Sequence, residues 1–306
     1  MIKFFPVTDS FACEVGDVDL SRPLTPEDEA AIKAAFWKYA VLVFPQQALT
    51  SDQHVAFSER FGPMEPNINT YADEVKKDRI DGRVSDISNL GEDNEILPAE
   101  SRKRRSGLAN RLWHTDSIFR HVPALTSLLY AHTVAPIGGF TEFADMRAAW
   151  DALPEAKRKK LEGLKVFHSI FHSRAKLGMT DYTERERASL PGAEQVLVRT
   201  IPQTGRKALY LASHAVNILG FAKEESNELL DELMEFATQR QFVYSHRWRV
   251  HDLVMWDNRC TMHRGTEYDE RRWKRDMHRA TVSDVGNTLE PGSPLNAAGT
   301  TEKRMA

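Results

Sequence analysis

The stretch LWHTDSIFRHVPALTSLLYAHTVAPIGGFTEFAD, residues 112–145, decides the fold class. It predicts three strands, at 112–119, 126–134 and 139–145, because β-branched and aromatic residues fill runs of strand length between turn residues. Helices do not alternate regularly with strands here or elsewhere, so a doubly wound parallel sheet is disfavoured. The centre of the chain is therefore expected to be mainly β.

Outward from this stretch, further strands are predicted on both sides. They cover residues 41–44, 165–171, 195–201, 207–211, 241–244, 252–256, 261–264 and 273–283. Helices are predicted to begin after the capping residues Thr25 and Thr50, at 147–153 and 154–164, and at 223–238, where leucines share one face. Many strands with helices at the N-terminus and in inserts predict a jelly roll of two sheets.

The composition excludes several classes of protein. The chain has 306 residues, 41% of them hydrophobic and 28% charged, with a net charge of −3. That charge gives no electrostatic footprint for nucleic acid, and no run approaches the roughly 18 apolar residues of a membrane span. Cys13 and Cys260 lie far apart and in no motif, which favours a reducing compartment. We therefore expect a cytoplasmic protein without a signal peptide.

A single domain is predicted over residues 1–285. Within it, residues 66–110 are polar and charged and show no periodic pattern. An insert of this kind is typically functional, and we expect it to form a lid. Its two charge runs, 76–79 and 102–105, are interpreted as a solvated face. Residues 286–306 are rich in Gly, Pro, Asn, Ser and Thr and are predicted to be a flexible tail.

A possible metal-ligand pair is the main chemical signal. His114-Thr115-Asp116 is the only His-x-Asp sequence in the chain. Residues two apart in a strand face the same side, so an imidazole and a carboxylate would point together into the sheet interior. Such a pair supplies two of the three ligands of a 2-His-1-carboxylate site for non-haem Fe(II). A surface strand pair explains the same spacing equally simply.

The third ligand must come from a distant segment. Among eleven histidines, His263 is the best placed because it lies in an apolar strand context. His214 and His246 are weaker candidates, and His54 is predicted on a polar helix face. A buried structural histidine is the plain alternative for each of them.

Two arginines follow His263. Arg275 and Arg279 are four apart in a predicted strand, so they share one face, about 13 Å apart. Inward-pointing guanidinium groups are costly unless each meets an anion, and their planar fork suits a carboxylate. Two exposed arginines on an edge strand are the alternative.

Over roughly residues 10–285, the chain resembles the Fe(II)/2-oxoglutarate-dependent dioxygenases of the taurine dioxygenase/2,4-dichlorophenoxyacetate dioxygenase (TauD/TfdA) family. It is most similar to the branch that cleaves aryloxyacetates such as 2,4-dichlorophenoxyacetate. The stretches that carry the likeness are AVLVF (40–44), RFGP (60–63), LWHTDS (112–117), GGFTEF (138–143), DMRAAW (145–150), VRT (198–200) and VMWDNR (254–259).

The resemblance implies a double-stranded β-helix and a set of site residues. Iron would be held by His114, Asp116 and His263. Thr141 and Arg275 would bind the distal carboxylate of 2-oxoglutarate, although Thr141 also fits an ordinary turn after two glycines. Arg279 and Asn110 would contact the substrate. The resemblance also implies dioxygen, ascorbate as an activator, a small anionic substrate and a homo-oligomer.

The implied reaction releases a phenol, glyoxylate, succinate and carbon dioxide. One alternative is the same chemistry on a sulfonate, a sulfate ester or another carboxylic acid. A second is a non-catalytic metal-binding jelly roll, and a third is a zinc hydrolase, because two histidines and an aspartate also bind zinc. Neither of the last two needs the pocket implied for Thr141 and Arg275.

Overall fold

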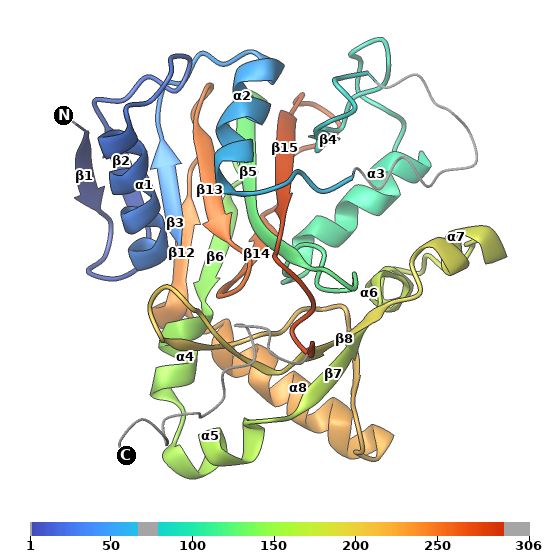
Figure 1. The fold of residues 1–306 in the computed structure, drawn as a ribbon. Helices are drawn as coiled ribbons and strands as arrows, with labels where there is room; N and C mark the ends of the chain where they lie inside the picture. Colours follow the sequence, from blue (N-terminus) through green and yellow to red (C-terminus); the bar gives the residue numbers. More distant parts are fainter. Residues whose placement is uncertain (1, 67–78, 291–306) are drawn as a thin grey trace, which may run out of the picture.

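The computed structural model describes residues 2–66 and 79–290. A seven-stranded sheet with the order β1-β2-β3-β13-β5-β15-β4 forms its centre (Figure 1). All neighbouring strands pair antiparallel except β2 and β3. In sheet order the strands are β1 (Lys3–Pro6), β2 (Cys13–Gly16), β3 (Val41–Phe44), β13 (Leu253–Asp257), β5 (Ala124–Thr133), β15 (Asp276–Ser283) and β4 (Ser85–Asp86).

Smaller sheets form the second layer. One has the order β12-β6-β14, another β11-β7-β8, and a third pairs β10 with β9. Their strands are β12 (Val243–His246), β6 (Thr141–Asp145), β14 (Thr261–Gly265), β11 (Ala215–Ile218), β7 (Lys165–His168), β8 (Ala193–Val196), β10 (Lys207–Leu209) and β9 (Val198–Thr200). This two-layer arrangement confirms the predicted jelly roll, a mainly β double-stranded β-helix with added helices.

Two helices begin where the capping chemistry predicts. The side chain of Thr25 accepts a hydrogen bond from the amide of Asp28, and Thr50 forms a reciprocal capping box with Gln53. The helices are α1 (Pro26–Tyr39), α2 (Ser51–Ser58), α3 (Arg102–Gly107), α4 (Met146–Ala152), α5 (Glu155–Leu161), α6 (Ile170–Ala175), α7 (Glu184–Ser189) and α8 (Lys223–Ala237), with 3-10 turns η1 (Glu59–Phe61), η3 (Leu108–Arg111) and η4 (Arg240–Phe242).

Apolar side chains cover both faces of the central sheet. Along β3, Leu42 and Phe44 pack with Phe36 of α1 and Phe57 of α2 on the outer face. The alternate residue Val43 packs on the inner face, with Phe143 of β6 and Met262 of β14. Because successive side chains point to opposite faces, a strand buried on both sides is continuously apolar. The inner layer between the sheets is where the polar site lies.

The structure corrects three sequence-based expectations. Residues 112–119 do not form a strand. His114 makes only an isolated bridge to His263, because Ser117 adopts a left-handed φ of 53° that ends extended structure. The short strands β1, β2, β4 and β11 were not predicted, and β4, α3 and η3 lie within the 66–110 insert.

The start of the predicted tail is packed. Asn287 donates its side-chain amide to the carbonyl of His121, and the buried hydroxyl of Thr288 donates to the side chain of Gln195. Residues 67–78 of the predicted lid and residues 291–306 of the predicted tail lie outside the described residues. Among the residues described, no helix combines the length and apolarity that a bilayer crossing requires.

Candidate active site

Three side chains from two segments form a buried cluster with metal-ligand chemistry. His114, Asp116 and His263 place one candidate ligand atom each within 4.8 Å of one another. The backbones of His114 and His263 exchange two hydrogen bonds, of 3.0 and 2.8 Å. Asp116 is brought in by the turn that follows, not by strand alternation. In the part of the chain that the structure describes, this is the one such cluster.

The His114 imidazole presents an unprotonated nitrogen to this cluster, and Nε2 of His263 lies beside the same carboxylate. Nδ1 of His114 lies 2.7 Å from the carbonyl of Leu112, so it carries the proton and leaves the Nε2 lone pair free. Nε2 of His114 and Nε2 of His263 lie 3.9 and 3.7 Å from the Asp116 carboxylate. Burial lowers the pKa of both histidines. Neutral imidazoles are the form that binds a metal.

The Asp116 carboxylate is held in its ionised form. Burial alone would raise its pKa, but the positive charge of Arg279 is the largest opposing effect, and the pKa is lowered to about 2. Arg279 donates Nη1 to Oδ1 at 2.6 Å, and Ser127 donates its hydroxyl to Oδ2 at 2.7 Å. Two neutral imidazoles and one carboxylate make a donor set that fits Fe(II).

Further polar residues contact Asp116 and orient this cluster. The side-chain oxygen of Asn258 accepts from the Asp116 amide at 3.3 Å and from the Trp256 indole at 3.0 Å. Its amide donates to the Ser127 hydroxyl at 3.0 Å. Sequence reasoning missed Ser127 and Asn258 as site residues, although Asn258 lies in the VMWDNR stretch. These contacts fix the carboxylate that a metal would meet.

Thr141 is the first residue of β6 and is buried. The indole of Trp248 donates to the Thr141 hydroxyl oxygen at 2.9 Å. This bond occupies the oxygen and leaves the hydroxyl proton to be donated elsewhere. The preceding Gly138 has φ of 72°, and a Cβ there would lie 2.2 Å from the Glu267 carbonyl. Only glycine therefore fits at position 138, in the turn that leads to Thr141. Sequence reasoning did not predict Trp248 as a site residue.

Arg275 immediately precedes β15 and lies next to the same turn. A Cβ on Gly139 would sit 3.6 Å from its Cδ. Among the described residues, none forms a hydrogen bond or an ion pair with the guanidinium. Burial lowers the pKa of Arg275, with Tyr268 and Glu270 opposing that effect. A partly buried guanidinium that forms no hydrogen bond or ion pair with a described residue is a site for an anionic ligand.

Of the remaining predicted residues, Asn110 and His214 each lie beside one histidine of the cluster, and His246 has a different partner. The Asn110 carbonyl lies 3.7 Å from the Cβ position of Gly265, at the end of β14, so Asn110 belongs to the neighbourhood of His263. His214 packs edge-on to the His114 ring and its Nδ1 lies 2.8 Å from the Ser173 hydroxyl. His246 instead contacts Asp252.

The expectation for His54 is wrong. It is buried, with a pKa lowered to about 3 by desolvation. Its Nε2 lies 3.1 Å from the carbonyl of Leu128. Tertiary packing buries the helix face that carries it, because α2 lies on the outer face of the central sheet.

Comparison with known proteins agrees with this geometry. Residues 3–281 match the family described as "Taurine catabolism dioxygenase TauD, TfdA family". The alpha-ketoglutarate-dependent 2,4-dichlorophenoxyacetate dioxygenase of Cupriavidus pinatubonensis is 43% identical over 279 residues, which cover 91% of this chain and 96% of that protein. The (S)-phenoxypropionate/alpha-ketoglutarate-dioxygenase of Sphingobium herbicidovorans is 38% identical and covers 78% and 80% respectively.

A solved structure has a closely similar fold. The crystal structure of AAD-2 in complex with Mn(II) and N-oxalylglycine superimposes with a TM-score of 0.87 at 44% identity, covering 95% of this chain and 100% of that one. The cofactor classes predicted from the sequence, Fe(II) with 2-oxoglutarate and dioxygen, are thereby confirmed. The chain belongs to the TauD/TfdA family of 2-oxoglutarate-dependent dioxygenases.

Proposed function

We propose that this enzyme hydroxylates a small aryloxyacetate-type carboxylic acid, with 2,4-dichlorophenoxyacetate as the representative substrate. One observation carries the proposal. The buried His–Asp–His cluster and Arg275, a guanidinium without an ion pair to a described residue, both adjoin β6: His263 pairs with Phe143, and Arg275 lies beside the turn that leads to Thr141. A metal-binding scaffold or a zinc hydrolase would use the first feature and has no use for the second.

In this proposal, Nε2 of His114, Nε2 of His263 and the Asp116 carboxylate hold Fe(II). When bound, the metal supplies the activation of dioxygen, with 2-oxoglutarate as the source of two electrons. Arg279 and Ser127 keep the Asp116 carboxylate ionised and oriented before any ligand arrives. The protein therefore contributes a preformed donor set that does not have to reorganise.

Arg275 and Thr141 bind the distal carboxylate of 2-oxoglutarate. The guanidinium supplies a charge and two parallel donors. The Thr141 hydroxyl adds a third donor, because the Trp248 indole already occupies its oxygen. Recognition at this end orients the cosubstrate so that its 2-oxo acid group faces His114, Asp116 and His263.

Arg279 binds the carboxylate of the substrate. One of its Nη groups is committed to Asp116, while its buried Nε has no partner among the described residues. The remaining donors can therefore hold an anion within reach of the metal centre. Asn110, beside the end of β14, is proposed to line the same space.

The overall reaction balances without a further reactant. One oxygen atom of dioxygen enters succinate as 2-oxoglutarate loses carbon dioxide, and the other is inserted into the C–H bond between the ether oxygen and the carboxylate. The resulting hemiacetal loses the aryloxy group as a phenol, which takes the hydroxyl proton, and the carbon becomes the aldehyde of glyoxylate.

The experiment that tests this proposal is a coupled product assay. The purified enzyme is supplied with Fe(II), ascorbate, dioxygen and 2-oxoglutarate, and succinate and phenol are measured with and without an aryloxyacetate. We expect the two products to rise together. Succinate that rises only with a sulfonate, a sulfate ester or another acid would keep the chemistry and overturn the substrate. The absence of succinate with every acid would overturn the proposed activity.

Several expectations remain predictions. Stimulation by ascorbate is tested by omitting it from that assay. Homo-oligomerisation is tested by light scattering of the purified protein, and a cytoplasmic location by cell fractionation. The proposed lid role of residues 66–110 is tested by limited proteolysis with and without substrate and cosubstrate.

A further inference from the structure

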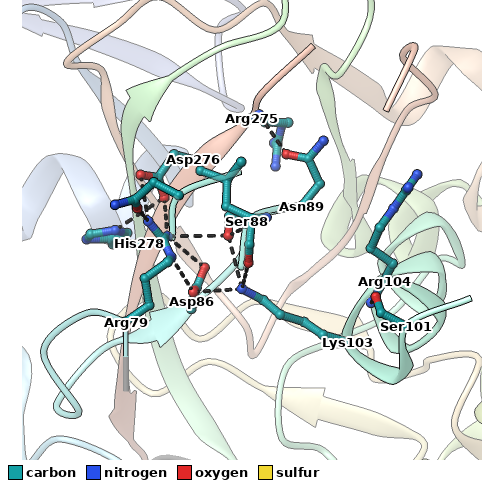
Figure 2. Close-up of polar contacts among 12 residues, drawn as sticks. Arg79, Asp86, Ser88, Asn89, Ser101, Lys103, Arg104, Arg275, Asp276 and His278 are labelled. Atoms are coloured by element: carbon teal, nitrogen blue, oxygen red, sulfur yellow. Dashed lines mark hydrogen bonds and ion pairs between the residues drawn. The ribbon is translucent and has the colours of Figure 1, made fainter. Parts of the chain in front are cut away.

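The backbone that carries Arg275 is held by a segment nearly 190 residues earlier in the sequence. Asn89 lies in the insert between β4 and α3, and it sits beside Arg275 in Figure 2. The two chain segments run side by side: the Ile87 amide donates to the Met277 carbonyl at 2.9 Å, and the Asn89 amide donates to the Arg275 carbonyl at 3.3 Å. The insert thus extends the short pairing between β4 and β15.

The side chain of Asn89 uses its full bonding capacity on the loop before β15. Its oxygen accepts from the Arg275 amide at 2.9 Å. Its two amide protons go to the carbonyls of Glu270 and Trp273, at 3.0 and 2.9 Å. Asn89 is only 5% exposed. One residue therefore ties three points of the 270–275 loop together.

An ionic network also joins the insert to β15 (Figure 2). Arg79 bonds both carboxylate oxygens of Asp86, at 2.9 and 3.0 Å, and both of Asp276, at 3.2 and 2.5 Å. Its side chain is only 7% exposed. Lys103 of α3 adds bonds to Asp86, Ser88 and the Leu90 carbonyl. Asn89 is thus delivered by a rigid support.

The Arg275 side chain needs such support. The guanidinium is partly buried and forms no ion pair with a described residue, so a rearrangement of the loop that exposes it further to water would lower its desolvation cost. The loop 270–275 carries exposed residues and no regular secondary structure. The clamp made by Asn89 opposes this rearrangement, because the backbone of Arg275 cannot move without breaking buried hydrogen bonds.

We propose that Asn89 is a positioning residue for the cosubstrate: it holds Arg275 in place for the distal carboxylate of 2-oxoglutarate without touching that ligand. This inference rests on the proposed role of Arg275. It assigns the 66–110 insert a part in cosubstrate binding, besides any part in covering the substrate. Preorganisation of this kind strengthens binding by removing the ordering cost.

The test compares the Mn(II)-loaded wild-type protein with Asn89→Ala and Asn89→Asp in anaerobic calorimetric titrations with 2-oxoglutarate and N-oxalylglycine. We expect the Kd of both ligands to rise about tenfold in Asn89→Ala. Asn89→Asp should bind both ligands still more weakly, because a carboxylate oxygen replaces the side-chain nitrogen that donates to the carbonyls of Glu270 and Trp273. In turnover, KM for 2-oxoglutarate should rise while kcat at saturation stays within about twofold.

The matched control is Lys274→Ala, which removes a charge adjacent to Arg275. The Lys274–Glu95 ion pair is exposed, at 41% and 69% of the two side chains, and such pairs contribute little. We expect wild-type Kd values for this variant. A tenfold loss in Lys274→Ala as well would mean that any change in the loop weakens binding, which would overturn a specific role for Asn89.

A second readout needs neither metal nor ligand. Amide hydrogen exchange across residues 270–276 should be faster in Asn89→Ala than in the wild type. If the alanine variant does not fold, Asn89→Ser, which adds no charge and retains one hydrogen-bonding group, replaces it. The inference is overturned if both Asn89 variants bind 2-oxoglutarate with the wild-type Kd while Arg275→Ala loses binding. A wild-type protein that binds no 2-oxoglutarate would instead overturn the proposed function.

Discussion

Replacing Trp248 by phenylalanine removes one hydrogen bond from the cosubstrate pocket. The indole donates to the Thr141 hydroxyl at 2.9 Å, and both side chains are buried. A buried neutral hydrogen bond contributes about 1 kcal/mol, so Trp248→Phe should raise the Kd of 2-oxoglutarate about fivefold. The physical reason is that the hydroxyl then rotates freely instead of presenting its proton to the carboxylate. Anaerobic titration calorimetry measures this change directly.

Thr141→Val provides the second arm of a double-mutant cycle. Valine has the shape of threonine and lacks the hydroxyl, so a bond to a charged carboxylate is lost, which corresponds to roughly a 10- to 100-fold rise in Kd. If Trp248 acts only through Thr141, adding Trp248→Phe to Thr141→Val should leave Kd unchanged. A further fivefold loss in the double variant would refute this reasoning, because Trp248 would then act through packing. Urea unfolding of each variant separates binding from stability.

The other predictions concern the metal centre, the substrate anion and pH. His114→Ala should abolish both Fe(II) binding and substrate-coupled succinate release, and intact turnover would contradict the ligand assignment. Removing metal with a chelator should leave the melting temperature nearly unchanged, because apolar clusters form the core, and activity should return with Fe(II) and not with Zn(II). Arg279→Ala should raise KM for acidic substrates, and an unaltered substrate profile would contradict the proposed anion contact. His168 is buried with both ring nitrogens unpartnered among the described residues, and desolvation lowers its pKa to about 3. As pH falls from 7.5 to 5.5 only the unfolded chain takes up this proton, so stability drops by about 1.4 kcal/mol on account of this residue. In urea unfolding, the free energy of unfolding of His168→Leu should fall by about 1.4 kcal/mol less between pH 7.5 and 5.5 than that of the wild type. An identical pH dependence in the variant would refute the role of His168 in this loss of stability.

Local chemistry determined much of the fold in advance. The helix starts at Thr25 and Thr50 depend on capping bonds within three residues, so sequence alone predicts them. The strand β3 is a short apolar run whose burial on both faces follows from its continuous hydrophobicity. The insert was harder, because α3 and β4 are short and are held by ion pairs between distant segments. Lys103 of α3 pairs with Asp86 of β4, and Arg79 links Asp86 to Asp276 of β15.

The metal cluster was predictable in its residues and not in its geometry. The His-x-Asp sequence and the apolar strand context made His114, Asp116 and His263 candidates, and the resemblance to a known family selected them as a set. The strand predicted around His114 is reduced to a bridge with His263, because the chain turns at Asp116 and Ser117: the Asp116 amide bonds to the Asn258 side chain, and Ser117 has a left-handed φ of 53°. The three ligands therefore come together through the turn at Asp116 and the backbone bridge between His114 and His263.

The sequence by itself determined the jelly-roll class and the helix starts at Thr25 and Thr50, because these depend on residue type and short-range spacing, and its resemblance to a known family selected the candidate ligands and the two arginines. Only the tertiary structure decided that Trp248 orients Thr141, that Ser127 and Arg279 hold Asp116, and that Asn89 clamps Arg275. The Arg279–Asp116 contact and the Arg275–Asn89 contact each join residues that are more than 160 positions apart in the sequence. Hydrogen bonds of this kind depend on where folding brings the backbone, and no local pattern encodes that position.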